Sequence, residues 1–154
     1  MVKIFESSIR DVSFGRNVKV IEPVNIYECN ISDNVSIGPF VEIQKGVTIG
    51  KNTKIQSHAF ICELVKIKKN VFIGHGVMFI NDTFSQGGPS QGDKSKWKKT
   101  LIGNNVSIGS NATIMPVKIC DHTVIGAGSV VTKSISTPGI YAGNPAVLIR
   151  KIKT

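Results

Sequence analysis

Hydrophobic residues recur along this chain at a strict interval of six. A small or β-branched residue follows each of the first eight anchors by four positions, and glycine or a polar residue usually follows the anchor directly. An amphipathic helix repeats its apolar face about every 3.6 residues and a half-buried strand every two, so neither explains this period. The nine anchors of the longest run are Ile31, Ile37, Ile43, Ile49, Ile55, Ile61, Ile67, Ile73 and Phe79.

The period predicts an all-β solenoid. Three hexads form one triangular coil, with a short strand on each side, a turn at each corner and the anchors pointing inward. The step resumes after an interruption and also extends backwards, through Phe14, Val20, Ile26, Ile102, Ile108, Ile114, Ile119, Ile125 and Val131. These eighteen hexads predict about six coils, with five-residue steps from Ile26 to Ile31 and from Ile114 to Ile119. Residues 1–154 are expected to form one β-helix domain.

The stacking of coils supplies a ruler for placing side chains. Adjacent strands of such a stack lie roughly 4.8 Å apart. Three hexads make eighteen residues, so residues eighteen apart in an unbroken stretch are expected to lie directly above one another.

A polar segment, about residues 81–101, interrupts the period. Its sequence, NDTFSQGGPSQGDKSKWKKTL, is too polar to continue an apolar column. Long loops inside compact folds are commonly functional, and Phe84 and Trp97 favour a loop that binds substrate. At the two ends of the chain, residues 1–13 are expected to form an irregular capping strand. The tail, residues 138–154, is expected to contain turns and then a final strand or helix.

The net charge of +9 favours polyanionic partners. Nucleic acid is not favoured, because the basic residues are scattered, few aromatics accompany them and no nucleic-acid-binding motif is present. Phosphate-bearing small molecules fit this charge at least as well. The basic run of the interrupting segment either forms a solvated loop or reaches a phosphate; it consists of Lys94, Lys96, Lys98 and Lys99.

The cysteines and the apolar stretches suggest where the protein resides. Cys29, Cys62 and Cys120 are odd in number and contain no CxxC pair, so reduced thiols are expected. Residues 1–10 carry charges and lack the apolar run of a signal peptide. No stretch of about eighteen apolar residues is present. We therefore expect a cytoplasmic protein without membrane insertion.

Four polar residues just before or at the start of the interrupting segment are candidates for chemistry. Glu63 and Asn81 are eighteen apart, so they are expected to stack at one corner of adjacent coils, with Asp82 beside Asn81. His75 falls on another corner and would meet them only across a subunit interface. Asn and Asp are also ordinary corner residues, and Glu63 alone would be a solvated corner. The stacking beside the polar segment favours a catalytic site.

The histidines do not favour a metal site. Hexapeptide solenoids with carbonic anhydrase activity hold zinc between subunits with three histidines, two of them close in sequence. Here His58, His75 and His122 are separated by 17 and 47 residues. We therefore expect no metal cofactor.

Several motifs together resemble the left-handed β-helix hexapeptide-repeat acyltransferases. They are IGNNVSIGSNATIMP, VIGAGSVVTK and YAGNPAVLIRKI, along with the repeats themselves. Within that superfamily, CELVKI, IGHGVMFIND and GGPSQGDKSKW are similar to N-acetyltransferases that act on dTDP-linked 3-amino-3,6-dideoxyhexoses. One departure is that Ile114-Met115-Pro116-Val117 lacks the glycine that often follows the proline. The resemblance implies a left-handed helix and a homotrimer with acetyl-CoA in a groove between subunits. It also implies a role in surface-glycan biosynthesis.

The chemistry of acyl transfer to an amine then suggests roles for the candidate residues. Asp82 or Glu63 would accept the proton of the amine if burial raised its pKa, and Asn81 would orient the amine. Direct attack, with the proton leaving toward the CoA sulfur, stays open.

Small residues and basic residues near the C-terminus suggest a coenzyme site. Gly109, Ser110, Ala127 and Gly128 would let the pantetheine chain approach the backbone, although they also suit ordinary corners. The suggested phosphate partners are Lys133, Arg150 and Lys151. Two alternatives remain, namely an acyltransferase for UDP-linked or 4-amino sugars and a non-catalytic binding solenoid.

Overall fold

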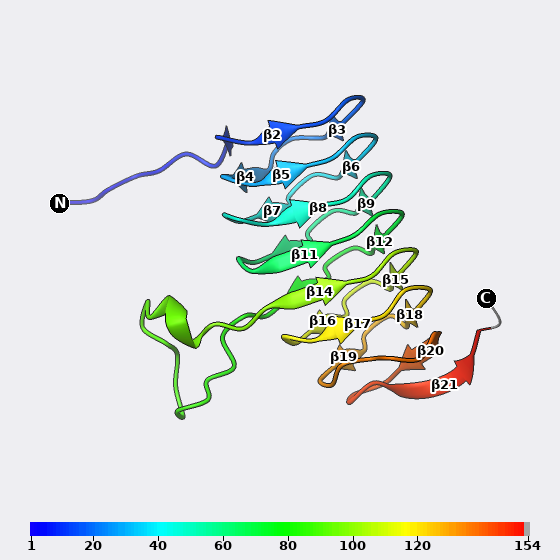
Figure 1. The fold of residues 1–154 in the computed structure, drawn as a ribbon. Coiled ribbons are helices and arrows are strands. Elements are labelled where there is room, and N and C mark those ends of the chain that lie inside the picture. Colours follow the sequence, from blue (N-terminus) through cyan, green and yellow to red (C-terminus); the bar gives the residue numbers. More distant parts are fainter. Residues whose placement is uncertain (153–154) are drawn as a thin grey trace.

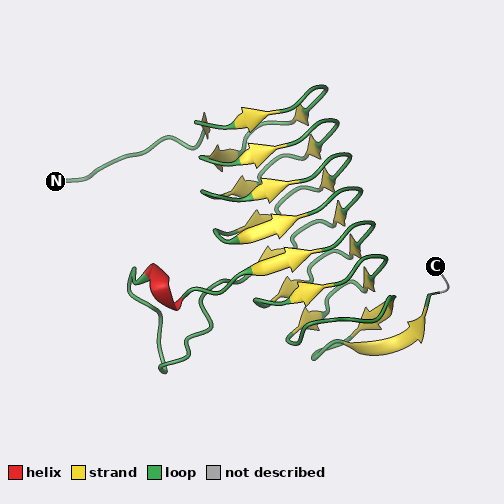
Figure 2. Cartoon of the chain, in the orientation of Figure 1, coloured by secondary structure: helices red, strands yellow, loops and turns green. Residues whose placement is uncertain are grey.

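The protein is a parallel β-helix. A computed structural model describes residues 1–152, and its strands stack in successive coils along one axis (Figure 1). Short strands and turns make up almost the whole described chain, apart from one 3-10 helix, η1 (Lys94–Lys96) (Figure 2). The six-residue period therefore predicted the architecture correctly.

Three sheets form the sides of the prism, and every strand pairs in parallel with its neighbours except the last pair. Sheet A contains β1 (Ile9–Arg10), β4 (Asn25–Tyr27), β7 (Glu42–Ile43), β10 (Phe60–Ile61), β13 (Met78–Phe79), β16 (Thr113–Ile114) and β19 (Val130–Val131). Sheet B contains β2 (Ser13–Phe14), β5 (Asn30–Ile31), β8 (Thr48–Ile49), β11 (Val65–Ile67), β14 (Thr100–Ile102) and β17 (Lys118–Ile119). Sheet C contains β3 (Lys19–Val20), β6 (Ser36–Ile37), β9 (Lys54–Ile55), β12 (Phe72–Ile73), β15 (Ser107–Ile108), β18 (Val124–Ile125), β20 (Gly139–Ala142) and β21 (Val147–Lys151).

The stack has seven turns, one more than expected from the anchors. The additional turn begins at β1, where Ile9 pairs with Ile26 of the next coil. Ile9 precedes Phe14 by five residues, so it falls off the six-residue step and was not counted as an anchor, unlike Phe14 and Val20 of the same coil. The segment expected to be an irregular cap therefore contributes a regular strand.

The strand register confirms the eighteen-residue ruler. Phe60 pairs with Glu42 on one side and with Met78 on the other, eighteen residues away in each direction. Side chains placed by this spacing in the unbroken stretch are therefore true neighbours along the stack. We name each corner of the prism after the sheets it joins: the A–B corner includes residues 62–64 and 80–99, the B–C corner 103–106, and the C–A corner 74–77, 109–112 and 126–129.

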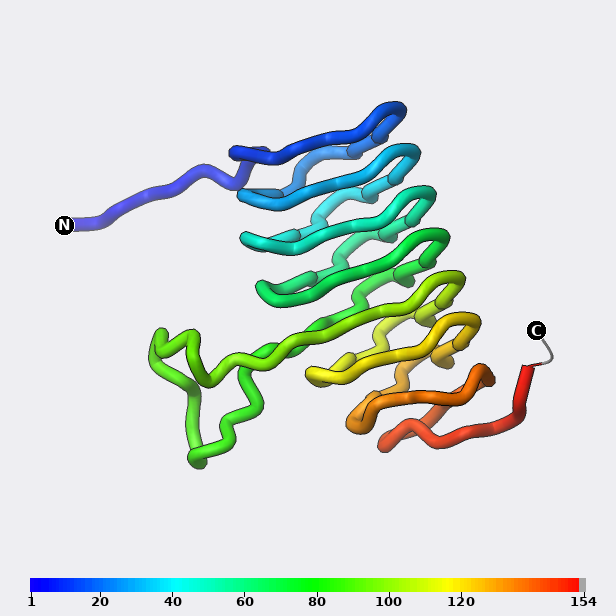
Figure 3. Tube along the Cα trace, viewed as in Figure 1, coloured from blue at the N-terminus to red at the C-terminus, as the bar shows by residue number. Residues whose placement is uncertain are grey.

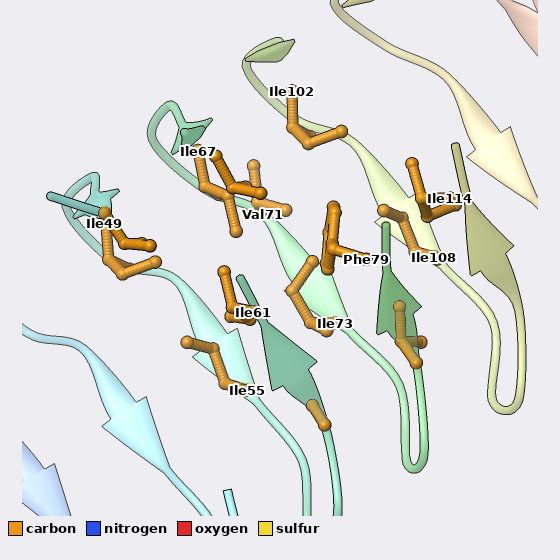
Figure 4. Close-up of a cluster of buried hydrophobic side chains, with 14 of the residues drawn as sticks. Ile49, Ile55, Ile61, Ile67, Val71, Ile73, Phe79, Ile102, Ile108 and Ile114 are labelled. Carbon is orange, nitrogen blue, oxygen red and sulfur yellow. The ribbon is translucent and has the colours of Figure 1, made fainter. Parts of the chain in front are cut away.

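The anchors form one continuous core along the axis. Figure 4 shows Ile55, Ile61, Ile73 and Phe79 directed into the space between the sheets, and all four are almost completely buried. Phe14 is an exception, since it is 40% exposed. It lies in the first coil, where no further coil covers the end of the stack. The prediction that every anchor points into a closed interior is therefore wrong at this end.

Asparagine forms a ladder along the B–C corner. Each member adopts a left-handed backbone conformation with φ between 55° and 59°, which asparagine tolerates better than most residues. Side-chain amides of successive coils are hydrogen bonded over 3.0 to 3.2 Å along Asn17, Asn34, Asn52, Asn70 and Asn105. The repeated corner residue therefore serves both the turn and the stacking.

Two segments depart from the stack. The chain leaves after β13 and returns at β14, so that residues 80–99 form a protruding loop (Figure 3). The C-terminal segment, expected to form a strand or a helix, forms the strand β21, which pairs antiparallel with β20. Residues 153 and 154 of the expected tail lie outside the described residues. Within residues 1–152, no helix is long and apolar enough to cross a membrane.

Candidate functional site

Glu63 and Asn81 are neighbours at the A–B corner, as the sequence predicted. Glu63 follows β10 and Asn81 follows β13, one coil further along the stack. The Asn81 side-chain Nδ2 donates a hydrogen bond to the Glu63 carbonyl oxygen over 3.3 Å. The backbone N–H of Lys98 donates to the Asn81 carbonyl over 2.9 Å, so the returning end of the loop is fixed beside this pair.

The Asp82 carboxylate is committed to the loop. It accepts hydrogen bonds from the backbone N–H groups of Ser90, over 2.7 Å, and Phe84, over 3.1 Å. These two bonds to the ionised form hold the pKa of Asp82 below its ordinary value. The pKa raised by burial that the sequence-based hypothesis required of a general base is therefore not found at Asp82, and a catalytic role for this residue stays a prediction. The carboxylate orders the turn that begins the loop.

Glu63 forms the main ionic contact of the corner. Its carboxylate oxygens accept hydrogen bonds from Lys94 Nζ over 2.7 and 2.9 Å, and its side chain is only 17% exposed. The Glu63 backbone N–H donates to the side-chain oxygen of Gln44 over 3.3 Å. The coil therefore holds the backbone of Glu63 in place, and the loop places the Lys94 ammonium against its carboxylate.

Trp97 organises the interior of the loop. Its indole Nε1 donates to Ser90 Oγ over 2.7 Å, and the Lys94 ammonium lies 5.2 Å from the centre of the indole ring. Ser90 is buried although the loop is polar. Phe84 is exposed and adopts a left-handed backbone conformation. The two aromatic residues predicted to bind substrate therefore differ, because Trp97 packs within the loop and Phe84 faces solvent.

A pocket of about 320 Å³ opens within the loop beside Asp82. It is lined by Asp82, residues 85–91 and Lys96. Sequence reasoning identified neither Ser90 nor the contact between Lys94 and Glu63. The loop has no repeat to place its residues, and the basic run gave no reason to choose Lys94 over its neighbours.

His75 lies at the C–A corner, away from Glu63 and Asn81, as predicted. Its Nδ1 is 2.8 Å from the Ser57 hydroxyl oxygen, eighteen residues earlier. The His75 carbonyl accepts a hydrogen bond from the backbone N–H of Asn111. In the next coil, the Ser110 carbonyl accepts one from Gly128 over 2.8 Å. His75 therefore shares a column with four residues suggested for the coenzyme, namely Gly109, Ser110, Ala127 and Gly128.

Gly109 and Gly128 are glycine for different physical reasons. A Cβ at Gly109 would lie 2.5 Å from the backbone nitrogen of Ala127, so coil stacking requires glycine there. Gly128 has a φ of +67°, and a Cβ would meet no atom within 4 Å. Gly109 is thus explained by packing alone. A Cβ at Gly128 would instead point into open space, so packing does not explain this glycine.

The three basic residues suggested for CoA phosphates are not gathered together. Lys133 follows β19 at the A–B corner. Arg150 and Lys151 lie on β21, opposite Ile140 and Gly139 of sheet C. Within one chain, these residues therefore do not form a single phosphate site.

The cysteines are all free. Burial raises the pKa of Cys29 to about 11 and that of Cys62 to about 12, so both thiols stay protonated at neutral pH. In the described part of the chain, no group of three His, Cys, Asp or Glu side chains is arranged to hold a metal ion.

Comparisons with known proteins agree with the fold and with the repeat. Residues 28–63 match the family described as bacterial transferase hexapeptide (six repeats), and residues 99–133 match the hexapeptide repeat of succinyl-transferase. The bifunctional protein GlmU of Streptococcus uberis is 33% identical over 150 residues, which cover 93% of this chain and 32% of that protein. The match spans about a quarter to a third of the length of these curated relatives.

Two solved structures extend the comparison over most of the chain. A point mutant of AntD, an N-acyltransferase from Bacillus cereus in complex with dTDP and coenzyme A, has a TM-score of 0.72 and 24% identity. The match covers 94% of this chain and 83% of that one. A galactoside acetyltransferase in complex with coenzyme A has a TM-score of 0.65 and 29% identity, covering 94% of this chain and 66% of that one.

Proposed function

The chain is a hexapeptide-repeat β-helix protein, and we propose that it is an acetyl-CoA-dependent N-acetyltransferase for a nucleotide-linked amino sugar. The acceptor proposed first is a dTDP-linked 3-amino-3,6-dideoxyhexose, as in surface-glycan biosynthesis. Support comes from similar proteins: AntD, an N-acyltransferase, was crystallised with dTDP and coenzyme A, and a galactoside acetyltransferase with coenzyme A.

The observation that carries the proposal is the A–B corner. There a carboxylate that is 17% exposed, Glu63, and an amide side chain, Asn81, lie in adjacent coils beneath an ordered polar loop. An acceptor amine needs groups of these kinds, because it must be held in position and must lose a proton. The pocket within the loop is lined by Asp82, which follows Asn81 in the chain, and by Lys96.

The proposed reaction involves the amine of the acceptor, the thioester of acetyl-CoA and the A–B corner. The neutral amine nitrogen attacks the thioester carbonyl carbon, a C–N bond forms, the C–S bond breaks, and the sulfur leaves as the thiol after taking a proton. An amine with a pKa near that of lysine, about 10, is mostly protonated at neutral pH. Because Asp82 is committed to backbone N–H groups, Glu63 is the carboxylate we propose to receive the proton. Asn81 is proposed to orient the amine.

The C–A corner is the proposed site of the narrow pantetheine chain of acetyl-CoA. Ser110, Ala127 and Gly128 provide small side chains along two consecutive coils, with open space beside Gly128. We propose that they hold this chain. In one protomer, no single phosphate site brings together Lys133, Arg150 and Lys151. We propose that they contact CoA phosphates from different corners or from different subunits.

The two corners lie on opposite margins of sheet A, so one chain does not bring donor and acceptor together. A homotrimer solves this problem if the A–B corner of one subunit faces the C–A corner of the next. In that arrangement His75 of one subunit approaches Glu63 and Asn81 of its neighbour. The trimer is thus part of the proposal.

The test is thiol release from acetyl-CoA with a panel of dTDP- and UDP-linked sugars that carry a 3-amino or a 4-amino group. The matched controls are the same sugars with a hydroxyl in place of the amine. We expect turnover that depends on the amine and is fastest with a dTDP-linked 3-amino sugar. Faster turnover of a UDP-linked or 4-amino sugar would replace the acceptor. Binding of these ligands without thiol release would instead indicate a non-catalytic solenoid.

A further inference from the structure

The contact between Lys94 and Glu63 joins a fixed carboxylate to an exposed cation. Glu63 belongs to a coil, where Asn81 and Gln44 hold its backbone on two sides. Lys94 reaches it from a loop, thirty-one residues away in sequence. The Glu63 side chain is 17% exposed, whereas that of Lys94 is 57% exposed.

This difference in exposure means that the two partners depend on the contact unequally. A carboxylate withdrawn from water is costly unless a cation or hydrogen-bond donors compensate it. A lysine that keeps most of its contact with water loses little when its ion pair breaks. Glu63 therefore requires a cation, and Lys94 is a partner that it can exchange.

The Lys94 ammonium has the chemistry of the proposed acceptor. It is a primary ammonium group, and both Glu63 oxygens bind it, over 2.7 and 2.9 Å. An amino sugar that enters protonated would offer the same group to the same carboxylate. The exchange would leave the charge at Glu63 unchanged, so the carboxylate would at no stage lack a cation.

We infer that the Lys94 ammonium occupies the subsite of the acceptor amine at Glu63 while no acceptor is bound, and that it thereby lowers the apparent affinity for the acceptor. The inference rests on the proposed function, because it takes the Glu63 carboxylate as the subsite for the acceptor ammonium. Binding of the acceptor displaces Lys94 from Glu63. This displacement changes the surroundings of the Trp97 ring, over which the Lys94 ammonium lies. Since part of the binding free energy is used to displace Lys94, the apparent affinity for the acceptor is lower than the intrinsic affinity of the open corner.

Removal of the ammonium tests this inference. Lys94→Ala should lower the KM for the acceptor by roughly two- to five-fold, as expected for loss of a partly exposed ion pair, and leave the KM for acetyl-CoA unchanged. Lys94→Arg keeps a cation that can bind both carboxylate oxygens, so it should keep or raise the acceptor KM. Lys99→Ala is the matched control, because it removes a neighbouring exposed lysine of the same loop and should change neither constant.

Trp97 supplies a readout that does not require turnover, since it is the only tryptophan of the chain. Lys94→Ala and Glu63→Gln should each change its emission in the free protein, and Lys99→Ala should not. Added nucleotide amino sugar, without acetyl-CoA, should change the emission of the wild type toward that of Glu63→Gln. The hydroxyl analogue should not produce this change.

The outcomes separate the two proposals. If no acceptor of the panel is turned over by the wild type, the proposed function is refuted. If an acceptor is turned over but Lys94→Ala leaves its KM unchanged or raises it, the function stands and the inference about Lys94 is wrong. Equal emission of the wild type and Glu63→Gln, with and without amino sugar, would also refute the inference.

Discussion

Asn81 donates a hydrogen bond from its side-chain Nδ2 to the carbonyl oxygen of Glu63, eighteen residues earlier in the chain. The bond joins two successive coils at the corner where the protruding loop begins. It therefore fixes the position of Asn81 along the stack relative to the Glu63 carboxylate. This position sets the geometry in which an acceptor amine would be held.

Replacement of Asn81 tests its orienting role. Asn81→Ala should lower kcat by roughly ten- to ten-thousand-fold, as expected when a positioning group is lost. Folding should survive, since the side chain lies outside the anchor columns. Steady-state kinetics and thermal unfolding give the two measurements. Asn30→Ala, which changes an exposed residue of sheet B, is the matched control. An Asn81→Ala enzyme with wild-type kcat would show that Asn81 is only a corner residue.

The asparagine ladder gives a prediction about stability. Asn52 has a φ of 59°, and its side chain is hydrogen bonded to both Asn34 and Asn70. Asn52→Ala should destabilise the fold by about 1–2 kcal/mol, because alanine is strained in the left-handed region. Asn52→Gly removes the same hydrogen bonds without this strain. Chemical denaturation should therefore rank the wild type first, Asn52→Gly second and Asn52→Ala last. Equal stability of the two variants would show that backbone strain contributes nothing at this corner.

The fold was predictable because each coil repeats the same physical requirement. A residue six positions after Ile55 must fill the same narrow core, and Ile61 does so. The same regularity predicted that Asn81 lies above Glu63. It failed at Ile9, where a five-residue step hid the first strand, and at Phe14, where the stack ends.

The loop was not predictable in the same way, since no repeat relates its residues to the coils. The sequence indicated a functional segment from its polar composition and its aromatic residues. It gave no means of learning that Asp82 would be bound by two backbone N–H groups, or that Lys94 would reach Glu63. These contacts depend on how the loop folds back, and they decide which carboxylate remains available for chemistry.

The loop is expected to contribute to function rather than to the stability of the coils. Replacement of residues 86–98 by a short Gly/Ser linker should leave the β-helix assembled, because the inward anchors are untouched. The kcat/KM for the acceptor should fall by roughly a hundredfold or more, since Trp97 and the ordered pocket are lost. Circular dichroism and kinetics check the two parts. An unchanged kcat/KM for both substrates would mean that the loop is dispensable.

The proposed shared site requires a trimer at working concentration. Phe72 of sheet C and Met78 of sheet A are partly exposed on the two sides of the corner that carries His75. Such apolar side chains favour burial against a neighbouring prism. Sedimentation at micromolar concentration should give a trimer, and Met78→Asp should weaken it and lower activity together. A stable monomer with full activity would contradict the shared site, whereas a dimer would show that the interface is different.

Asp82 is predicted to order the loop. Lowering the pH should reveal this role, because it protonates the Asp82 carboxylate. Its folded-state pKa lies below the ordinary value of 3.8 because Ser90 and Phe84 donate to the ionised carboxylate. The stabilisation is therefore complete above an unfolded-state pKa of about 3.9 and is lost as the pH falls through the lower folded-state pKa. Trp97 emission should change in this acidic range. Asp93→Asn is the matched control, since Asp93 also has a lowered pKa but caps η1.

At neutral pH, a substitution of Asp82 distinguishes a role in ordering the loop from a role as general base. Asp82→Asn keeps one side-chain oxygen as an acceptor but removes the charge that both backbone N–H groups favour. If Asp82 orders the loop, this variant should raise the acceptor KM, lose the acid step in Trp97 emission and keep kcat within roughly tenfold of the wild type. Glu63→Gln should instead lower kcat strongly, because it removes the proposed proton acceptor. A large fall in kcat for Asp82→Asn with an unchanged acceptor KM would restore Asp82 as the general base and exclude the ordering role argued from its hydrogen bonds.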